Sequence, residues 1–162
     1  MQLKLADYKA GKDRAAIEML MAHYAMDPMG GGQPLPSDVL GNLCDTLATV
    51  PNAATLLIYD DQSPVALATA LQGFSTFKCQ PLLNIHDVIV LSEYRGLGLA
   101  KRLMAELESL AVERGCCKLT LEVLQGNIVA RAVYLGCGFA AYELDPQQGH
   151  ALFWQKDLCA KS

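Results

Sequence analysis

The sequence predicts one α/β (α+β) domain covering residues 1–162, and three observations support this prediction. A chain of 162 residues has the usual size of a single domain with one core. Hydrophobic residues make up 52% of the chain, which suits a globular protein and argues against disorder. Segments with helical periodicity also alternate with segments of β pattern, so helices are expected to pack on a sheet.

The N-terminal half is expected to contain three strands and two helices, separated by segments rich in Pro, Gly and Asp. In chain order these are a strand over 2–7, a helix from Lys12 or Asp13 to about Met26, a loop over 27–34, a helix from Ser37 or Asp38 to about Thr49, and strands over 55–59 and 65–77. The loop over 27–34 contains three consecutive glycines, which suit either a mobile segment that closes over a substrate or an ordinary flexible connector.

The C-terminal half is expected to contain four strands and two helices. In chain order these are a buried strand over 83–90, a helix with leucines at 99, 103, 107 and 110, a strand over 118–123, a short helix after Asn127, and a last hairpin-like pair over 142–144 and 151–156.

The segment Tyr94-Arg95-Gly96-Leu97-Gly98-Leu99-Ala100 lies between a predicted strand and a predicted helix. Such a turn leaves backbone N–H groups unpaired at the positive end of the helix dipole, and this arrangement suits a phosphate. Gly96 and Gly98 allow the backbone to approach an anion without an intervening Cβ. The segment is not an ATPase phosphate loop, and Lys101 stands where a dinucleotide fingerprint requires glycine. A turn that needs glycine only for its backbone geometry is the simpler alternative.

A second motif runs from Gly126-Asn127 to Gly138-Phe139. Asn127 is a good N-cap for a short helix, and Gly136 or Gly138 ends that helix. Asn127 and Tyr134 are seven residues apart, which is nearly two turns at about 100° per residue, so both project from one stripe. This stripe carries an amide and a phenol near its two ends.

The two motifs together resemble those of the GCN5-related N-acetyltransferase (GNAT) superfamily. The first family pattern, [QR]-x-x-G-x-[GA], is complete in Arg95–Ala100, and the second, N-x-x-A-x-x-x-Y-x-x-x-G-F, is complete from Asn127 to Phe139. The resemblance covers about residues 55–158, and the segment from Leu83 to Gly96 looks most similar to the polyamine (spermidine/spermine-type) branch. It implies a mixed, mostly antiparallel central sheet of about six to seven strands flanked by about four helices.

The resemblance also implies acetyl-CoA as the acetyl donor and assigns residues to it. Val88, Ile89 and Val90 would pair with the pantetheine arm like an added strand, and Asn127 would bond the pantetheine or a nearby water. Tyr134 would protonate the departing thiolate. The pyrophosphate would be bound through backbone N–H groups of Arg95, Gly96, Leu97, Gly98, Leu99 and Ala100, with the phosphate groups also reached by Lys101, Arg102 and Arg131.

An acetyl transfer to an amine requires a base, because a free alkylamine with a pKa of roughly 10 is almost wholly protonated at neutral pH. The candidates are His86, Asp87 and Glu122. His86 and Asp87 are neighbours on one strand, so their side chains point to opposite faces and at most one faces the site. His86 is also a plausible hydrogen-bonded strand residue, and Asp87 could instead anchor a loop or bind the cationic amine. Tyr134 likewise suits half-buried packing.

Composition excludes some classes of function. A net charge of −4 and a pI near 5.3 disfavour nucleic acid and anionic membranes as partners and suit a cationic substrate. No apolar run reaches the length of a membrane span and no signal peptide is recognisable, so a cytoplasmic location is expected. Six cysteines without a C-x-x-C pair and only three histidines predict no metal site.

The function we expect is transfer of an acetyl group from acetyl-CoA to a primary amine of a small molecule, polyamine-like or otherwise, by direct attack in a ternary complex. Asp27, Phe74 and Phe77 are candidates for recognising such an amine by charge and cation–π contact. The alternatives are a protein or peptide N-acetyltransferase and a non-catalytic module that binds acyl-CoA. The family also implies a possible homodimer.

Overall fold

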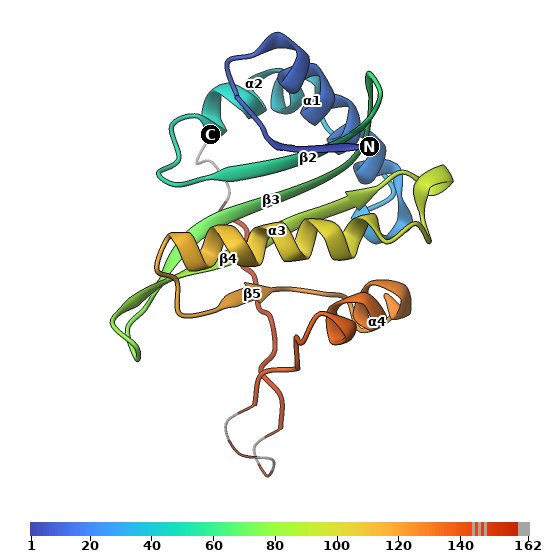
Figure 1. Ribbon diagram of the computed structural model, residues 1–162. Helices are drawn as coiled ribbons and strands as arrows, with labels where there is room; N and C mark the ends of the chain where they lie inside the picture. The colour runs from blue at the N-terminus through green and yellow to red at the C-terminus, as the bar shows by residue number, and fades with distance from the viewer. Residues whose placement is uncertain (144, 146, 148, 159–162) are drawn as a thin grey trace.

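The computed structural model describes residues 1–143, 145, 147 and 149–158, and its centre is a sheet covered by helices on both faces (Figure 1). The strands are β1 (Gln2–Leu5), β2 (Ala54–Asp60), β3 (Ser63–Ser75), β4 (Gln80–Val90) and β5 (Leu119–Leu121). The helices are α1 (Gly11–Met26), α2 (Ser37–Leu47), α3 (Leu99–Glu113) and α4 (Ile128–Gly136), with short 3₁₀ turns η1 (Pro28–Gly30) and η2 (Ser92–Tyr94).

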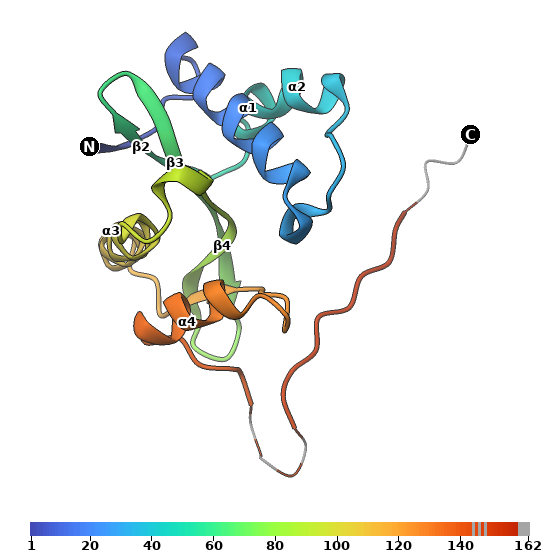
Figure 2. The same cartoon turned by 90° about the vertical axis from the view of Figure 1, so that its right-hand side faces the viewer.

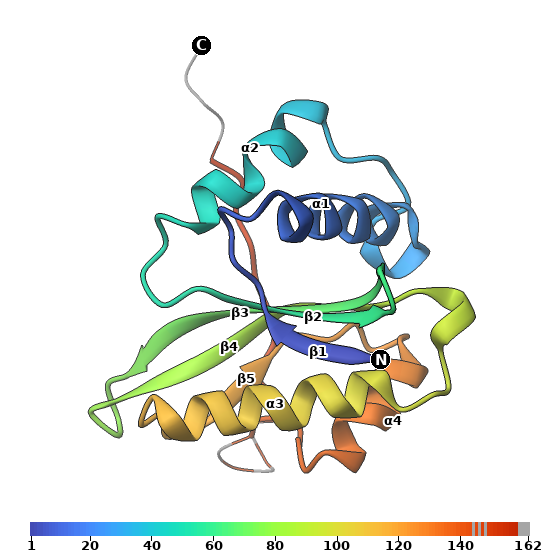
Figure 3. The same ribbon diagram turned by 45° about the horizontal axis from the view of Figure 1, so that its top comes forward.

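The five strands lie in sequence order, β1-β2-β3-β4-β5. The first four pair antiparallel, and β5 joins β4 in parallel because α3 carries the chain back across the sheet. Helices α1 and α2 cover one face and α3 the other, as Figure 3 shows. Strand β2 is buried along almost its whole length, since Leu56 and Ile58 face the α3 layer while Leu57 and Tyr59 face the α1 layer.

A β-bulge interrupts β4 at His86. Thr69 pairs with Asp87 and Ala70 pairs with Ile85, so His86 is the extra residue on the bulged strand. Before the bulge, Ile85 packs in the α3 core; after it, Ile89 packs in the α1 core. The bulge therefore turns Asp87 toward the α1 layer. Simple alternation from Ile85 would instead have placed Asp87 on the α3 face.

The structure describes five strands, one or two fewer than the six to seven predicted. Among the described residues of the expected last hairpin, only an isolated bridge is present, between Glu143 and His150. Leu144 lies outside the described residues. The alternating apolar residues of 151–156 fit a strand, but a strand also requires a neighbour for its backbone groups, and among the described residues none runs beside this segment.

The remaining elements form where the sequence predicts them, with ends that differ by a few residues. The first helix begins at Gly11, the second ends at Leu47, and the strand expected over 118–123 contracts to Leu119–Leu121. In the part of the chain that is described, no helix has both the length and the apolar character that a bilayer crossing requires.

Candidate active site

The edge of β4 that faces β5 is partly open. β5 pairs only with Leu83–Ile85, whereas β4 continues to Val90. The Leu91 N–H donates to the Val65 carbonyl at 3.0 Å, which fixes the hydrogen-bonding alternation of the β3–β4 ladder. By that alternation the backbone groups of Ile89 face β3, and those of Val88 and Val90 point to the opposite, open edge. This edge offers backbone donors and acceptors to an extended ligand.

The glycine turn follows β4 in the chain, after the short 3₁₀ turn η2. Gly96 and Gly98 have φ angles of 81° and 77°, in the left-handed region that favours glycine. Gly98 is the N-cap of α3 and supplies no side-chain cap, so the first N–H groups of the helix receive no side-chain acceptor there. The structure thus contains the strand, glycine turn and uncapped helix start that the sequence predicts.

The Arg95 side chain connects this turn to a distant loop. Its Nε donates to the Val90 carbonyl at 3.2 Å, and its Nη2 donates to Asp27 Oδ2 at 2.9 Å. The Asp27 Oδ1 also accepts from the Met29 N–H at 2.8 Å and so caps η1. That backbone hydrogen bond and the Arg95 guanidinium hold the pKa of Asp27 below its ordinary value.

The other three candidate cations make contacts away from the turn. The Lys101 ammonium lies beside Gly136 at the C-terminal end of α4, where the helix dipole is negative. Arg102 donates to the Met1 carbonyl at 3.2 Å, and Arg131 donates to the Gln125 carbonyl at 3.0 Å. Phosphate contacts by Arg95, Lys101, Arg102 and Arg131 remain predictions.

Asn127 and Tyr134 occupy the two ends of α4. The Asn127 Oδ1 accepts from the Ala130 N–H at 3.1 Å, which confirms its position as N-cap. Tyr134 is half-buried against the α3 core, with its ring centroid 6.0 Å from that of Phe139. Burial raises the pKa of Tyr134 to about 12. The phenol therefore keeps its proton throughout the neutral range.

Asp87 of β4, Tyr24 of α1 and Tyr134 of α4 are linked by electrostatic effects on their pKa values. Burial raises the pKa of Asp87, an effect that His86 opposes. Burial also raises the pKa of Tyr24, with a further contribution from the Asp87 charge, and Tyr24 contributes in turn to the raised pKa of Tyr134. Tyr24 was not among the site residues predicted from the sequence. It lies half-buried at the C-terminal end of the apolar stripe of α1, and a phenol on that stripe was the available signal.

The other two candidate bases are exposed. His86 lies at the bulge with its side chain in solvent. Glu122 is also exposed and accepts from Asn84 Nδ2 at 3.3 Å. Across the described ranges, no three His, Cys, Asp or Glu side chains gather in a way that could hold a metal ion.

These features define a family. The sequence pattern of the acetyltransferase (GNAT) family matches residues 17–139, which is most of the chain, and the protein belongs to this family. The match includes α1 from Ile17 onward, the open edge of β4, the glycine turn and all of α4.

Individual relatives agree with this assignment. Thialysine N-epsilon-acetyltransferase of Bos taurus is 30% identical over 96 residues, which are 58% of this chain and 55% of the relative. The chain thus matches about half the length of that curated relative.

Solved structures share the fold. A possible acetyltransferase from Clostridium difficile 630 has a TM-score of 0.77 and 20% identity over 98% of each chain. An aminoglycoside N-acetyltransferase in complex with CoA has a TM-score of 0.75 and 17% identity, covering 97% of this chain and 95% of that one.

Proposed function

We propose that this protein is an acetyl-CoA-dependent N-acetyltransferase that acts on a primary amine of a small, cationic molecule. The observation that carries the proposal is the succession of two backbone surfaces: the open edge at Val88 and Val90 is followed, after the short turn η2, by the uncapped turn at Gly96–Leu99. An extended chain with amide groups that ends in a diphosphate matches this order of donors and acceptors.

The chain's residues fit such a donor substrate. Val88 and Val90 would hold its amide-bearing arm, while the N–H groups of the turn and the Arg95 guanidinium would hold the diphosphate. Bound acetyl-CoA supplies an activated acetyl group as a thioester. A Val88 N–H pointing out of the sheet is the donor we assign to the thioester carbonyl, where it would stabilise negative charge in the transition state.

Two protons have to move during the transfer. We assign the proton donated to the thiolate to Tyr134, because its phenol stays protonated at neutral pH. We assign removal of the amine proton, directly or through water, to Asp87, because the bulge turns it toward the α1 layer and Tyr24. The pKa of Asp87 is raised by burial, in the direction that makes a carboxylate a better base.

Charge supports this substrate class. Burial raises the pKa of Tyr24, with smaller contributions from the charges of Asp87 and Asp27, and the chain carries a net charge of −4. Two carboxylates that act on one phenol suit an amine that carries more than one positive charge, as a polyamine does. The thialysine N-epsilon-acetyltransferase relative acts, by its name, on a side-chain amine of a small molecule, which supports the same class. A cytoplasmic location and a homodimer remain predictions of the sequence.

The test is a panel of acceptors, with thiol detection of released CoA. Polyamines, diamines, lysine analogues, aminoglycosides and amino-terminal peptides are compared at equal concentration. We expect release with the first three classes and much less with peptides. Preference for peptides would instead indicate a protein N-acetyltransferase. CoA binding by calorimetry without turnover of any acceptor would indicate a binding module, and the absence of CoA binding would refute both.

A further inference from the structure

Three hydroxyl groups form a row in the layer between the sheet and α1. The Tyr8 hydroxyl lies 2.9 Å from Thr55 Oγ1, and Thr55 Oγ1 lies 3.1 Å from Thr69 Oγ1. Thr55 is 0% exposed and Thr69 is 5% exposed, in a layer built mainly from apolar side chains such as Leu57 and Leu67. Valine has the same shape as threonine and would pack there without burying a polar group, so the row indicates a role beyond packing.

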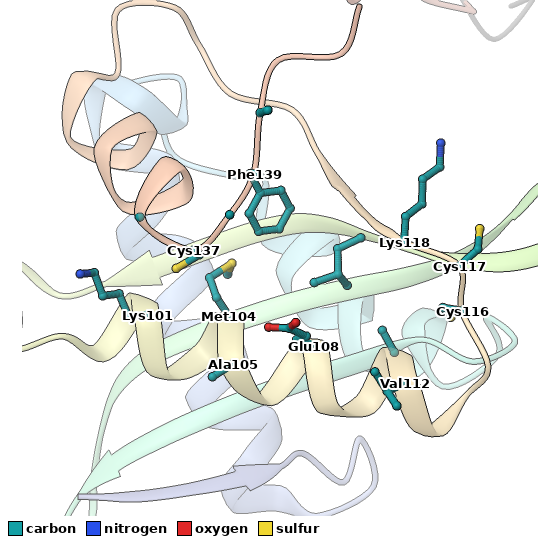
Figure 4. A pocket seen from close by; sticks show the side chains of 15 residues that line it. Lys101, Met104, Ala105, Glu108, Val112, Cys116, Cys117, Lys118, Cys137 and Phe139 are labelled. Atoms are coloured by element: carbon teal, nitrogen blue, oxygen red, sulfur yellow. The ribbon is translucent and has the colours of Figure 1, made fainter.

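The row lies on the face of the sheet that α1 covers. Leu57 and Leu67 pack in the α1 core, and strand alternation places Thr55 and Thr69 on the same face. Figure 2 shows α1 and α2 on this side of β2, β3 and β4, and α3 on the other side. A hollow of about 620 Å³ lies against α3 instead, with Phe139 in its wall (Figure 4). The hydroxyls therefore face away from that hollow and have one another as partners.

Asp87 is the next residue in this row. Thr55 pairs with Thr69 across β2 and β3, and Thr69 pairs with Asp87 across β3 and β4. The bulge at His86 puts Asp87 on the same face, toward α1. The Cβ atoms of directly opposed strand residues are about 4.5–5.5 Å apart, a separation that a hydrogen bond between a hydroxyl and a carboxylate spans. The row therefore leads from Tyr8 to the acid that we assign as the base.

The three hydroxyls have one proton to spare. Two hydrogen bonds use two of their three protons. A phenol is a stronger donor than an aliphatic alcohol, so the preferred order runs from Tyr8 through Thr55 to Thr69. Burial raises the pKa of Tyr8, against the opposing effect of its hydrogen bond to Thr55, so the phenol keeps its proton at neutral pH. The proton left over is then that of Thr69, beside Asp87, and the two preceding bonds polarise it.

Several elements contribute groups that influence the charge of Asp87. The titratable groups are His86 of its own strand, Tyr24 of α1 and, through Tyr24, Asp27 of the following loop and Tyr134 of α4. Burial disfavours the charged carboxylate, and His86 favours it. β3 contributes Thr69, an uncharged donor. A hydrogen bond from this hydroxyl would favour the charged carboxylate, in the same direction as His86.

We propose that Thr69 is a positioning residue for Asp87: its hydroxyl donates to the charged Asp87 carboxylate, and Thr55 and Tyr8 hold that hydroxyl in place. Both bonds of the row can run in either direction, so the row can also accept from Asp87 once the carboxylate has taken a proton. The role in the reaction rests on the proposed function, in which Asp87 is the base. The hydrogen bond itself does not.

The first test needs no turnover. The Asp87 carboxyl carbon is titrated by ¹³C NMR in the full chain, with and without Thr69→Val. We expect the variant to move the midpoint upward by about one pH unit, because the charged carboxylate loses a donor. Thr120→Val is the matched control on β5, where the hydroxyl accepts from Asn84 Nδ2 at 3.0 Å, and should leave the midpoint unchanged. Equal midpoints in wild type and Thr69→Val would overturn the proposal.

Further variants separate the hydroxyl from packing. Thr69→Ser keeps the hydroxyl and should titrate like wild type. Thr55→Val and Tyr8→Phe should each move the midpoint upward by less than Thr69→Val, and they keep the test open if Thr69→Val does not fold. Thr55→Val added to Thr69→Val should have no further effect, because the row acts on Asp87 only through Thr69. A Thr69→Ser protein that titrates like Thr69→Val, or midpoints that Thr55→Val and Tyr8→Phe leave unmoved, would contradict the row.

The second test is the pH dependence of kcat/KM for the amine that is turned over fastest. Its acid limb should move upward in Thr69→Val by the same amount as the NMR midpoint, because both report the charge of Asp87. An acid limb that stays in place while the NMR midpoint moves would overturn the role in the reaction. A wild type that turns over no amine would refute the proposed function and this role with it, whereas the titration would still decide on the hydrogen bond.

Discussion

Arg95 of the glycine turn and Asp27 of the loop after α1 form an ion pair at 2.9 Å, although 68 residues separate them in the sequence. The pair joins the turn that we assign to the diphosphate to the loop that borders the proposed amine site. Arg95 is half-exposed, so the pair itself contributes little to stability. Its importance lies in the competition between Asp27 and a bound anion for the same guanidinium.

Opposite effects on CoA affinity are therefore expected from the two partners. Arg95→Gln should weaken CoA binding about five- to tenfold, a loss of about 1–1.4 kcal/mol. Asp27→Asn retains the cap on Met29 but frees Arg95, and should leave the affinity equal or higher. Calorimetry with CoA measures both. Arg114→Gln is the control for charge, since Arg114 donates to the Asn52 carbonyl at the other end of α3. An Arg95→Gln protein with unchanged affinity would remove the guanidinium from the site.

Tyr134→Phe should lower kcat more than tenfold while CoA affinity changes little, because the variant loses only the hydroxyl that we assign as the acid. The pKa of Tyr134 is about 12, so the pH–rate profile should show no loss of activity from this group at neutral or mildly alkaline pH. Steady-state kinetics measure the turnover. Tyr142→Phe, an exposed phenol, is the matched control. Equal turnover in wild type and Tyr134→Phe would count against the acid role.

Asp87→Asn should make the protein more stable and less active. The pKa of Asp87 is raised in the folded state, so the unfolded chain releases this proton more readily. Stability is therefore lost as the pH rises from the ordinary value of 3.8 through the raised value, and the penalty persists at neutral pH. We expect a higher Tm than wild type at pH 7, equal Tm values below pH 3.8, and kcat/KM for amines reduced about a hundredfold. A larger loss in His86→Gln would assign the base to His86 instead.

Asp13 is expected to be the most costly acidic residue to replace. It is 1% exposed and accepts from Lys4 Nζ, the Asp7 N–H and the Tyr59 hydroxyl. Burial would raise its pKa, but the hydrogen bonds from Lys4 and Asp7 outweigh burial and lower it. Asp13→Ala should cost about 2–3 kcal/mol in urea denaturation at pH 7. This contribution exists above the ordinary pKa of 3.8 and is lost as the pH falls through the lower folded value, so the two proteins should converge in acid. Asp38→Asn, at an exposed site, should change stability by less than about 0.5 kcal/mol.

Gly30→Ala should displace the loop after α1. A Cβ at Gly30 would overlap the carbonyl oxygen of Tyr24 at the end of α1. We expect a loss of about 1–3 kcal/mol and a lower kcat/KM, because Tyr24 would move with the loop. Gly41→Ala is the matched control in α2, where an added Cβ meets nothing within 4 Å. It should stabilise the protein by about 0.5–1 kcal/mol, since glycine is unfavourable inside a helix. Similar melting curves for wild type and Gly30→Ala would contradict this expectation.

Much of the fold could be predicted from local patterns. Leucines at helical spacing predicted α3, β-branched residues predicted β4, and Asn127 predicted the start of α4. These predictions succeed because period and capping depend on neighbouring residues alone. The same local patterns failed for the last hairpin. The 151–156 segment has the pattern of a strand, but strand formation depends on a partner elsewhere in space.

The sequence by itself determined the chemical groups of the candidate site: two glycines that permit a positive φ, an uncapped helix start and a phenol on a short helix. These depend on local backbone geometry, which a few adjacent residues control. Only the tertiary structure decided which groups meet. The bulge at His86 reversed the alternation of β4 and turned Asp87 toward Tyr24, and loop packing brought Asp27 to Arg95. Such encounters depend on long-range register and packing, for which no short stretch of sequence carries a signal.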